Sequence, residues 1–169
     1  MQNDGTRWTP PPQAVYKLNY NVAVFEDSAS FGFGAVIRNS IGEVMAVMTV
    51  KGLVVQGSEV VELLACHKAL EFAIDASFTV LIVEGDSVNA TRCIASGSDI
   101  QSAIGHVVGD TRHLLGALEW ASMSCTKRNG NRVAHVLARH AQNVNVDLFW
   151  MEEVPSVAVE CVNIDASLI

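Results

Sequence analysis

Zinc-binding and redox cysteine motifs are absent from this sequence. Its four cysteines form no Cys-x-x-Cys pair, and each lies among apolar residues or near the end of an expected element; they are Cys66, Cys93, Cys125 and Cys161. Unpaired cysteine commonly serves as a small core residue. We therefore expect reduced core thiols, and neither disulfides nor zinc ligands.

Long hydrophobic runs are also missing. No apolar stretch approaches the ~20 residues of a membrane-spanning helix, and the N-terminal Met-Gln-Asn-Asp-Gly has neither the basic nor the apolar region of a signal peptide. The chain has 169 residues, half of them hydrophobic, which suits one packed domain. We expect a soluble intracellular monomer without a membrane partner, or a fragment of a longer protein, in the nucleus or the cytoplasm.

Positive charge is scarce. The chain has 11 Lys and Arg residues against 18 Asp and Glu, and its formal net charge is -7. Because phosphate binding depends on Lys and Arg, this balance weakens a nucleic-acid hypothesis. Four basic residues nevertheless fall within a short stretch, which leaves a local basic surface open; they are Lys127, Arg128, Arg132 and Arg139.

Several common functional signatures are absent as well. The sequence has no internal repeat, no P-loop glycine pattern, no dinucleotide fingerprint and no Ser or Cys nucleophile elbow. The polar residues that remain as candidates lie far apart along the chain. They are Asn21 on a first strand, Glu62 early in a helix, Asp86 after a buried strand, and His135 in a late helix.

Hydrophobic periodicity predicts strands and helices in a mixed order. The expected strands are 17–25, 32–38, 43–50, 81–85 and a strand within 117–126, and the expected helices are 58–76 with Ser58 as N-cap, 88–95, 99–116 and 132–143. The first three strands, joined by short turns, predict an antiparallel meander. We interpret residues 1–14 as a Pro-rich lead-in, 15–152 as the domain and 153–169 as a C-terminal tail.

A short aliphatic run that ends on a carboxylate is the first candidate site. Residues 81–87 read Leu-Ile-Val-Glu-Gly-Asp-Ser, as in a central strand covered on both faces, and Ser87 can N-cap the next helix. Ligands of open α/β sheets bind outside the carboxyl ends of such strands, where Asp86 is expected. The alternative is a strand-to-helix turn that uses Asp for local reasons.

A second carboxylate lies on the apolar face of an expected helix. Glu62 is in line with small residues, opposite the charged face; these residues are Cys66, Ala69 and Ala73. A buried carboxylate is costly unless it finds a cation or hydrogen-bond donors, which favours a functional role. The alternative is a first-turn Glu stabilised by the helix N-terminus.

In order and spacing, these motifs resemble the type 1 ribonuclease H domain, particularly its plant, retroelement-associated branch. The motifs are Trp8-Thr9-Pro10-Pro11-Pro12, Lys17-Leu18-Asn19-Tyr20-Asn21, Gly32-Phe33-Gly34-Ala35-Val36-Ile37-Arg38-Asn39, Val61-Glu62-Leu63-Leu64-Ala65, Val83-Glu84-Gly85-Asp86-Ser87 and Asn131-Arg132-Val133-Ala134-His135-Val136-Leu137-Ala138-Arg139. The resemblance implies an α/β fold with a mixed five-stranded sheet and flanking helices. Strands one to three would be antiparallel, and strands four and five parallel to strand one.

The resemblance also implies a chemistry. Members of this family cut the RNA strand of an RNA-DNA hybrid with two magnesium ions held by carboxylates. Glu62 and Asp86 keep two acidic positions, whereas Asn21 stands where the family has its first-strand Asp and His135 replaces the last Asp. The implied catalytic set is therefore Glu62, Asp86, His135 and Asn21, with Asp86, Glu62 and Asn21 as metal ligands.

The missing charge at Asn21 predicts weak metal binding. A unit charge pair at ~4 Å is worth roughly 4 kcal/mol gross at an effective dielectric of ~20, and more against a divalent ion. We therefore expect weakly bound magnesium, with manganese as an alternative. Four residues are expected to contact nucleic acid: Lys127, Arg128, Asn131 and Arg132.

Three functional hypotheses follow. The first is a hybrid-binding domain of this hydrolase family whose cleavage is weakened or lost. The second is an active magnesium- or manganese-dependent hybrid nuclease, in which Asn21 serves as a neutral ligand. The third is a catalytically inert protein-interaction scaffold.

Overall fold

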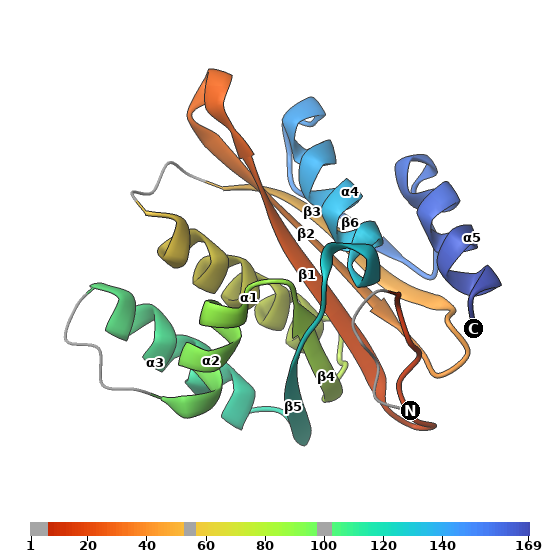
Figure 1. The fold of residues 1–169 in the computed structure, drawn as a ribbon, viewed down its shortest axis with the longest axis horizontal. Coiled ribbons are helices and arrows are strands. Elements are labelled where there is room, and N and C mark those ends of the chain that lie inside the picture. The colour runs from red at the N-terminus through yellow and green to blue at the C-terminus, as the bar shows by residue number, and fades with distance from the viewer. Residues whose placement is uncertain (1–6, 53–56, 98–102) are drawn as a thin grey trace.

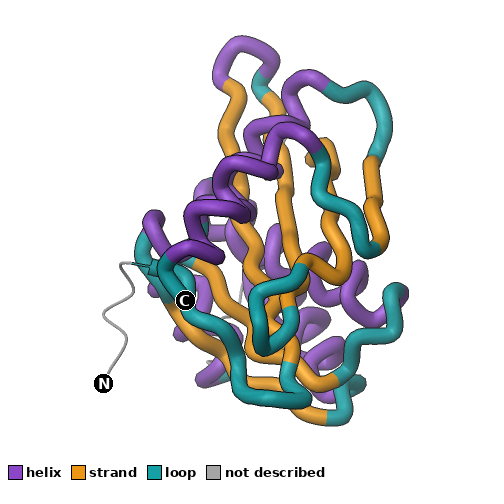
Figure 2. Tube along the Cα trace, turned by 90° about the vertical axis from the view of Figure 1, so that its right-hand side faces the viewer, coloured by secondary structure: helices purple, strands orange, loops and turns teal. Residues whose placement is uncertain are grey.

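The computed structural model describes residues 7–52, 57–97 and 103–169. Its strands are β1 Tyr16–Phe25, β2 Ser30–Arg38, β3 Val44–Gly52, β4 Val80–Gly85, β5 Trp120–Cys125 and β6 Leu148–Met151, and its α-helices are α1 Ser58–Asp75, α2 Val88–Ser96, α3 Ala103–Gly116, α4 Arg132–His140 and α5 Val159–Ser167. The sheet separates α1, α2 and α3 from α4 and α5 (Figure 1). In a view turned by 90°, helices lie in front of the strands and behind them (Figure 2).

The predicted mixed sheet is confirmed. β1, β2 and β3 form an antiparallel meander, while β4 pairs parallel with β1 and β5 parallel with β4. The predicted number of five strands is wrong, because the described sheet has six, in the order β5-β4-β1-β2-β3-β6. β6 pairs antiparallel with β3. It is only 4 residues long, too short for its side-chain alternation to stand out in the sequence.

Helix boundaries agree with the expected ones within a few residues. Ser87 caps α2 as predicted, since its side chain accepts a hydrogen bond from the Ala90 backbone N–H. The predicted N-cap of α1 is wrong by one residue, because Gly57 takes this position with φ of 102° and Ser58 is already helical. Asp99, the expected start of α3, lies outside the described residues. No helix in the described ranges is long and apolar enough to cross a membrane.

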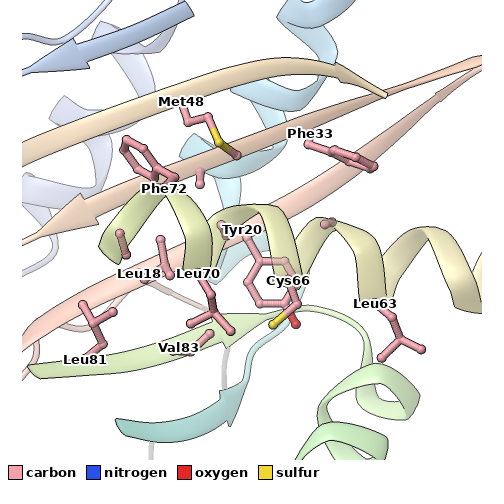
Figure 3. Close-up of a cluster of buried hydrophobic side chains, with 14 of the residues drawn as sticks. Leu18, Tyr20, Phe33, Met48, Leu63, Cys66, Leu70, Phe72, Leu81 and Val83 are labelled. Atoms are coloured by element: carbon pink, nitrogen blue, oxygen red, sulfur yellow. The ribbon is translucent and has the colours of Figure 1, made fainter. Parts of the chain in front are cut away.

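The main hydrophobic core lies between the sheet and α1. Alternate residues of β1, Leu18 and Tyr20, point into it and meet Leu70 of α1 and Val83 of β4 (Figure 3). Cys66 belongs to this core, where burial raises its thiol pKa to about 12. All four cysteines are free, as expected, but Cys125 is exposed and is therefore not a core residue.

The opposite face of the sheet carries α4 at very close range. A Cβ atom added to Gly34 would overlap the backbone of Ala134 and Ala138, and one added to Gly32 would overlap the Ala138 carbonyl oxygen. These two glycines let α4 lie directly on β2. Because α4 packs so closely on β2, its side chains lie near the middle of the sheet.

The segment after residue 152 is more than an irregular tail. It forms α5, whose buried Asp165 accepts a hydrogen bond from Arg38 of β2 at 2.7 Å. The Arg38 guanidinium also lies 3.9 Å from the ring centre of the buried Trp8, within the Pro-rich lead-in. Segments from both ends of the chain therefore pack on the α4 face.

Candidate active site

Pairing of two parallel strands brings Asn21 and Asp86 together. β1 and β4 are in register through the pair Asn19 and Glu84, so residues two positions further on lie side by side where β4 ends. The Asn21 Nδ2 atom lies 3.5 Å from Asp86 Oδ2. Asn21 is buried, and Asp86 is half-buried at the mouth of the site.

Helix α4 adds His135 to this pair. The His135 Nδ1 atom lies 3.5 Å from Asn21 Nδ2, and the His135 Nε2 atom lies 3.1 Å from Arg128 Nη2. A guanidinium has only donors, so His135 Nε2 accepts this hydrogen bond and the ring is neutral in this arrangement. Burial, Arg128 and Arg139 lower the pKa of His135, against the opposing effect of Asp86.

Glu62 of α1 completes the site from the other side. Burial raises the pKa of its carboxyl group to about 7, and the negative charge of Asp86 adds to this shift. Its Oε2 atom is buried and has no hydrogen-bond partner among the described residues. Next to it is a cavity of about 220 Å³, lined also by Ser87, Asn89 and Cys93. The two carboxylates therefore lie near enough to interact electrostatically.

The carboxyl group of Asp86 is held in a mixed environment. Burial raises its pKa, whereas its own backbone N–H, His135, Arg128 and the Asn21 amide lower it. Among these groups, Arg128 supplies positive charge and the Asn21 amide supplies a hydrogen-bond donor. The site therefore stabilises the Asp86 carboxylate partly with groups of the protein itself.

The arrangement does not fit a tightly bound magnesium ion. The Asn21 Oδ1 atom accepts a hydrogen bond from the Val22 backbone N–H at 2.7 Å, so the amide turns its N–H donors toward Asp86. Magnesium requires oxygen ligands in near-octahedral geometry. Within the described ranges, no group of three or more His, Cys, Asp or Glu residues could hold a metal ion. Among the described residues of this site, only the carboxylates of Glu62 and Asp86 remain for a cation.

The basic residues after β5 lie beside this site. Lys127 and Arg128 are exposed and Arg132 is half-buried at the start of α4. Asn131, which the sequence also predicted to contact nucleic acid, is fully buried, and its Nδ2 atom donates to the Tyr20 carbonyl oxygen at 2.9 Å. This hydrogen bond ties the start of α4 to β1.

The sequence interpretation missed a buried polar network under the site. Glu84 lies in the middle of it: its two carboxylate oxygens accept hydrogen bonds from Asn19 at 2.9 Å, from Ser124 at 3.1 Å and from Lys17 at 3.4 Å. Asn19 Nδ2 also donates to Asn131 Oδ1 at 3.2 Å. This network ties β1, β4 and β5 to the start of α4.

A signal for this network is present in the sequence. β1 reads Lys-Leu-Asn-Tyr-Asn, with a polar residue at every second position, and Glu84 interrupts an aliphatic strand. Alternation in a strand places these polar residues on one face, opposite the apolar core. A buried face of alternating Lys and Asn requires a charged partner, and Glu84 is the acid in the neighbouring strand.

The chain matches a protein-family model over most of its length. The sequence model of the family described as reverse transcriptase-like matches residues 19–141, which include every candidate site residue. No protein with a curated description matches the chain.

Solved structures share the fold at low sequence identity. Ribonuclease H1 from the archaeon Halobacterium salinarum is 21% identical, with a TM-score of 0.69 over 77% of this chain and 98% of that one. The N-terminal ribonuclease H domain of a Mycobacterium tuberculosis protein is 16% identical, with a TM-score of 0.66 over 76% and 93%. A ribonuclease H1 isolated from compost, solved in complex with an RNA/DNA hybrid, is 16% identical, with a TM-score of 0.65 over 76% and 96%.

Proposed function

The chain belongs to the reverse transcriptase-like family, as a ribonuclease H type 1 domain, and we propose that it binds RNA-DNA hybrids while cleaving them weakly or not at all. One observation carries this proposal. The amide of Asn21 directs its N–H donors, at 3.5 Å, toward the carboxylate of Asp86. A cation between these two groups would have to displace a hydrogen bond and would gain no charge from Asn21.

Electrostatics give the expected size of the defect. A unit charge at ~4 Å contributes roughly 4 kcal/mol gross at an effective dielectric of ~20, and a divalent ion would gain about twice as much. Even after the cost of burying another carboxylate, we expect the loss to weaken magnesium binding by orders of magnitude. Manganese, which accepts nitrogen ligands such as His135 more readily, is expected to bind somewhat better.

Hybrid binding is supported by the charge next to the site. Arg128 contacts His135, and the exposed Lys127 precedes it in the same turn. These cations lie on a protein with a net charge of -7, so electrostatic attraction to nucleic acid depends on local basic surfaces such as this one. The backbone of an RNA-DNA hybrid would approach the site from the side of the turn Arg128–Gly130.

Binding and cleavage of one labelled RNA-DNA hybrid test the proposal together. The native protein should bind the hybrid with an affinity that falls with salt, and it should release little product with magnesium or manganese. The double variant Lys127→Ala/Arg128→Ala should bind more weakly, whereas Lys51→Ala, which removes an exposed cation on β3, should not. Absence of salt-dependent binding above that of a like-charged control protein would favour an inert scaffold.

An active nuclease is the second candidate, and His135 favours it. Its lowered pKa keeps the imidazole neutral beside Asp86, where it can take up a proton. Rapid cleavage by the native protein, lost in Asp86→Asn, would establish this function and reject the weakened site. The catalytic set would then be Glu62, Asp86, His135 and Asn21.

A further inference from the structure

An unprotected sheet edge lies on the far side of the molecule from β5. Among the described strands, β3 is the sole pairing partner of β6, so the other edge of β6 carries backbone groups with no strand beside them. Proteins usually protect such edges with Lys, Pro or a bulge. The sequence of β6, Leu-Phe-Trp-Met, contains none of these residues.

The same strand exposes large apolar side chains. Phe149 and Met151 keep 56% and 55% of their surfaces exposed, although both lie on the face of the sheet that α1 covers further along. The Phe149 ring lies 5.9 Å from the ring centre of Phe72 at the end of α1. A cavity of about 270 Å³ lies beside these rings and is lined also by Asp75, Ala76 and Met151.

The segments that precede and follow β6 in the chain are acidic. Residues 144–153 contain no basic residue, and Asp147, Glu152 and Glu153 flank β6 on both sides, all exposed. Asp75 adds a further carboxylate at the rim of the cavity. An apolar strip with acidic residues at both ends complements a partner that has apolar residues between Lys or Arg residues.

We propose that β6 is a docking site for a partner protein, which adds an extended basic segment as a further strand. Main-chain hydrogen bonds along the free edge would supply affinity, and alternate apolar side chains of the segment would cover Phe149 and Met151. β6 has 4 residues, so the added strand is equally short. The site is separate from the candidate active site, and the proposal does not depend on the nuclease chemistry.

A second copy of the chain is a poorer occupant. In an antiparallel pair of two β6 strands centred on Trp150, Asp147 of one copy would lie opposite Glu153 of the other. Like charges directly opposite each other destabilise a sheet. Because the flanking segments contain no basic residue, such a dimer would have no charge pair to offset this repulsion.

A synthetic peptide provides the test. The probe is a short fluorescein-labelled peptide that alternates Lys with Val and Phe, and its binding to the full chain is followed by fluorescence anisotropy. One control peptide has Glu in place of Lys, and a second is N-methylated at alternate residues, which removes its strand hydrogen bonds. The variants are Phe149→Lys and Met151→Lys, with Val24→Lys as the matched control, because Val24 is 58% exposed on β1.

The proposal expects saturable binding of the basic peptide to the native chain and to Val24→Lys. Phe149→Lys and Met151→Lys should each weaken it by about tenfold or more, and neither control peptide should bind. Circular dichroism checks that each variant is folded. Equal binding of the N-methylated peptide, or no effect of either β6 variant, would overturn the proposal. A native dimer in sedimentation that Phe149→Lys dissociates would also overturn it, in favour of a second copy.

Discussion

The side-chain nitrogen of Asn21 lies 3.5 Å from a carboxylate oxygen of Asp86, where a hydrogen-bond donor faces an acid. In a site built for a divalent cation, both groups would instead present oxygen atoms to the ion. The Asn21 amide thus compensates part of the negative charge of Asp86 without a metal.

Asn21→Asp should make the stability of the protein depend on magnesium. Without divalent cations, the new carboxylate replaces a donor with a like charge, and we expect a loss of roughly 1 to 3 kcal/mol in the free energy of unfolding. Added magnesium should raise the melting temperature of the variant much more than that of the native protein.

The matched control for this substitution is Asn145→Asp. It introduces the same charge on an exposed residue away from the site. If magnesium shifts the melting temperatures of both variants equally, the carboxylate at position 21 does not form part of a cation site. Cleavage of a labelled hybrid by Asn21→Asp, faster than by the native chain, would provide the functional counterpart.

Stability without metal should fall as pH rises through the range in which Glu62 ionises. Its pKa is raised from 4.5 to about 7, so the folded state binds the Glu62 proton more tightly than the unfolded state. The resulting stabilisation is fully present below pH 4.5 and is lost as pH rises to about 7. Glu62→Gln should remove this part of the pH dependence, while Glu59→Gln, an exposed neighbour on α1, should keep it. Thermal unfolding in the presence of a chelator, repeated across this pH range, measures the pH dependence of stability. Superimposable profiles for the native protein and Glu62→Gln would contradict the prediction.

The sequence is informative where neighbouring residues determine the structure. β1 to β3 follow from alternation and short turns, and Asp86 follows from an aliphatic run that ends before a helix cap. Asn21 and Asp86 meet because β1 and β4 pair in parallel. Asn19 is paired with Glu84, so the residues two positions further along each strand also lie side by side. His135 is brought in by the close approach of α4 to Gly34, which the Gly-Phe-Gly motif permits.

Long-range polar contacts are what the sequence left undetermined. Arg38 and Asp165 are 127 residues apart and pair through a helix that has little hydrophobic periodicity. Asn131 follows a basic loop in the sequence, and its side chain is nevertheless buried in hydrogen bonds to Tyr20 and Asn19. The residues next to Arg38, Asp165 and Asn131 in the sequence indicate neither that these side chains are buried nor which residues they pair with.

Removing Glu84 should strongly destabilise the protein, because it would leave the buried Lys17 without its acidic partner. Burial already lowers the pKa of Lys17, against the opposing effect of Glu84. We expect Glu84→Ala to cost about 3 to 5 kcal/mol in the free energy of unfolding. The double variant Lys17→Met/Glu84→Leu should cost less than Glu84→Ala alone, since it removes both charges. Denaturant unfolding gives the stability of both variants. A double variant less stable than Glu84→Ala would show that the loss in Glu84→Ala does not come from the uncompensated charge of Lys17.

The charge of Arg128 should set the protonation of His135. Burial lowers the pKa of this histidine first, and Arg128 adds to the shift because a nearby cation disfavours the imidazolium. In Arg128→Ala the imidazole loses this cation and the hydrogen bond to Nε2, so its pKa should rise, and the midpoint of its titration should move to higher pH. Lys127→Ala removes the adjacent exposed cation, which does not contribute to the shift, and should leave the midpoint unchanged.

The imidazole proton resonances of His135, followed by NMR against pH, provide the measurement. An unchanged midpoint in Arg128→Ala would mean that burial and Arg139 account for the lowered pKa without Arg128, and Arg128 would then have no role at the site beyond its charge toward a phosphate.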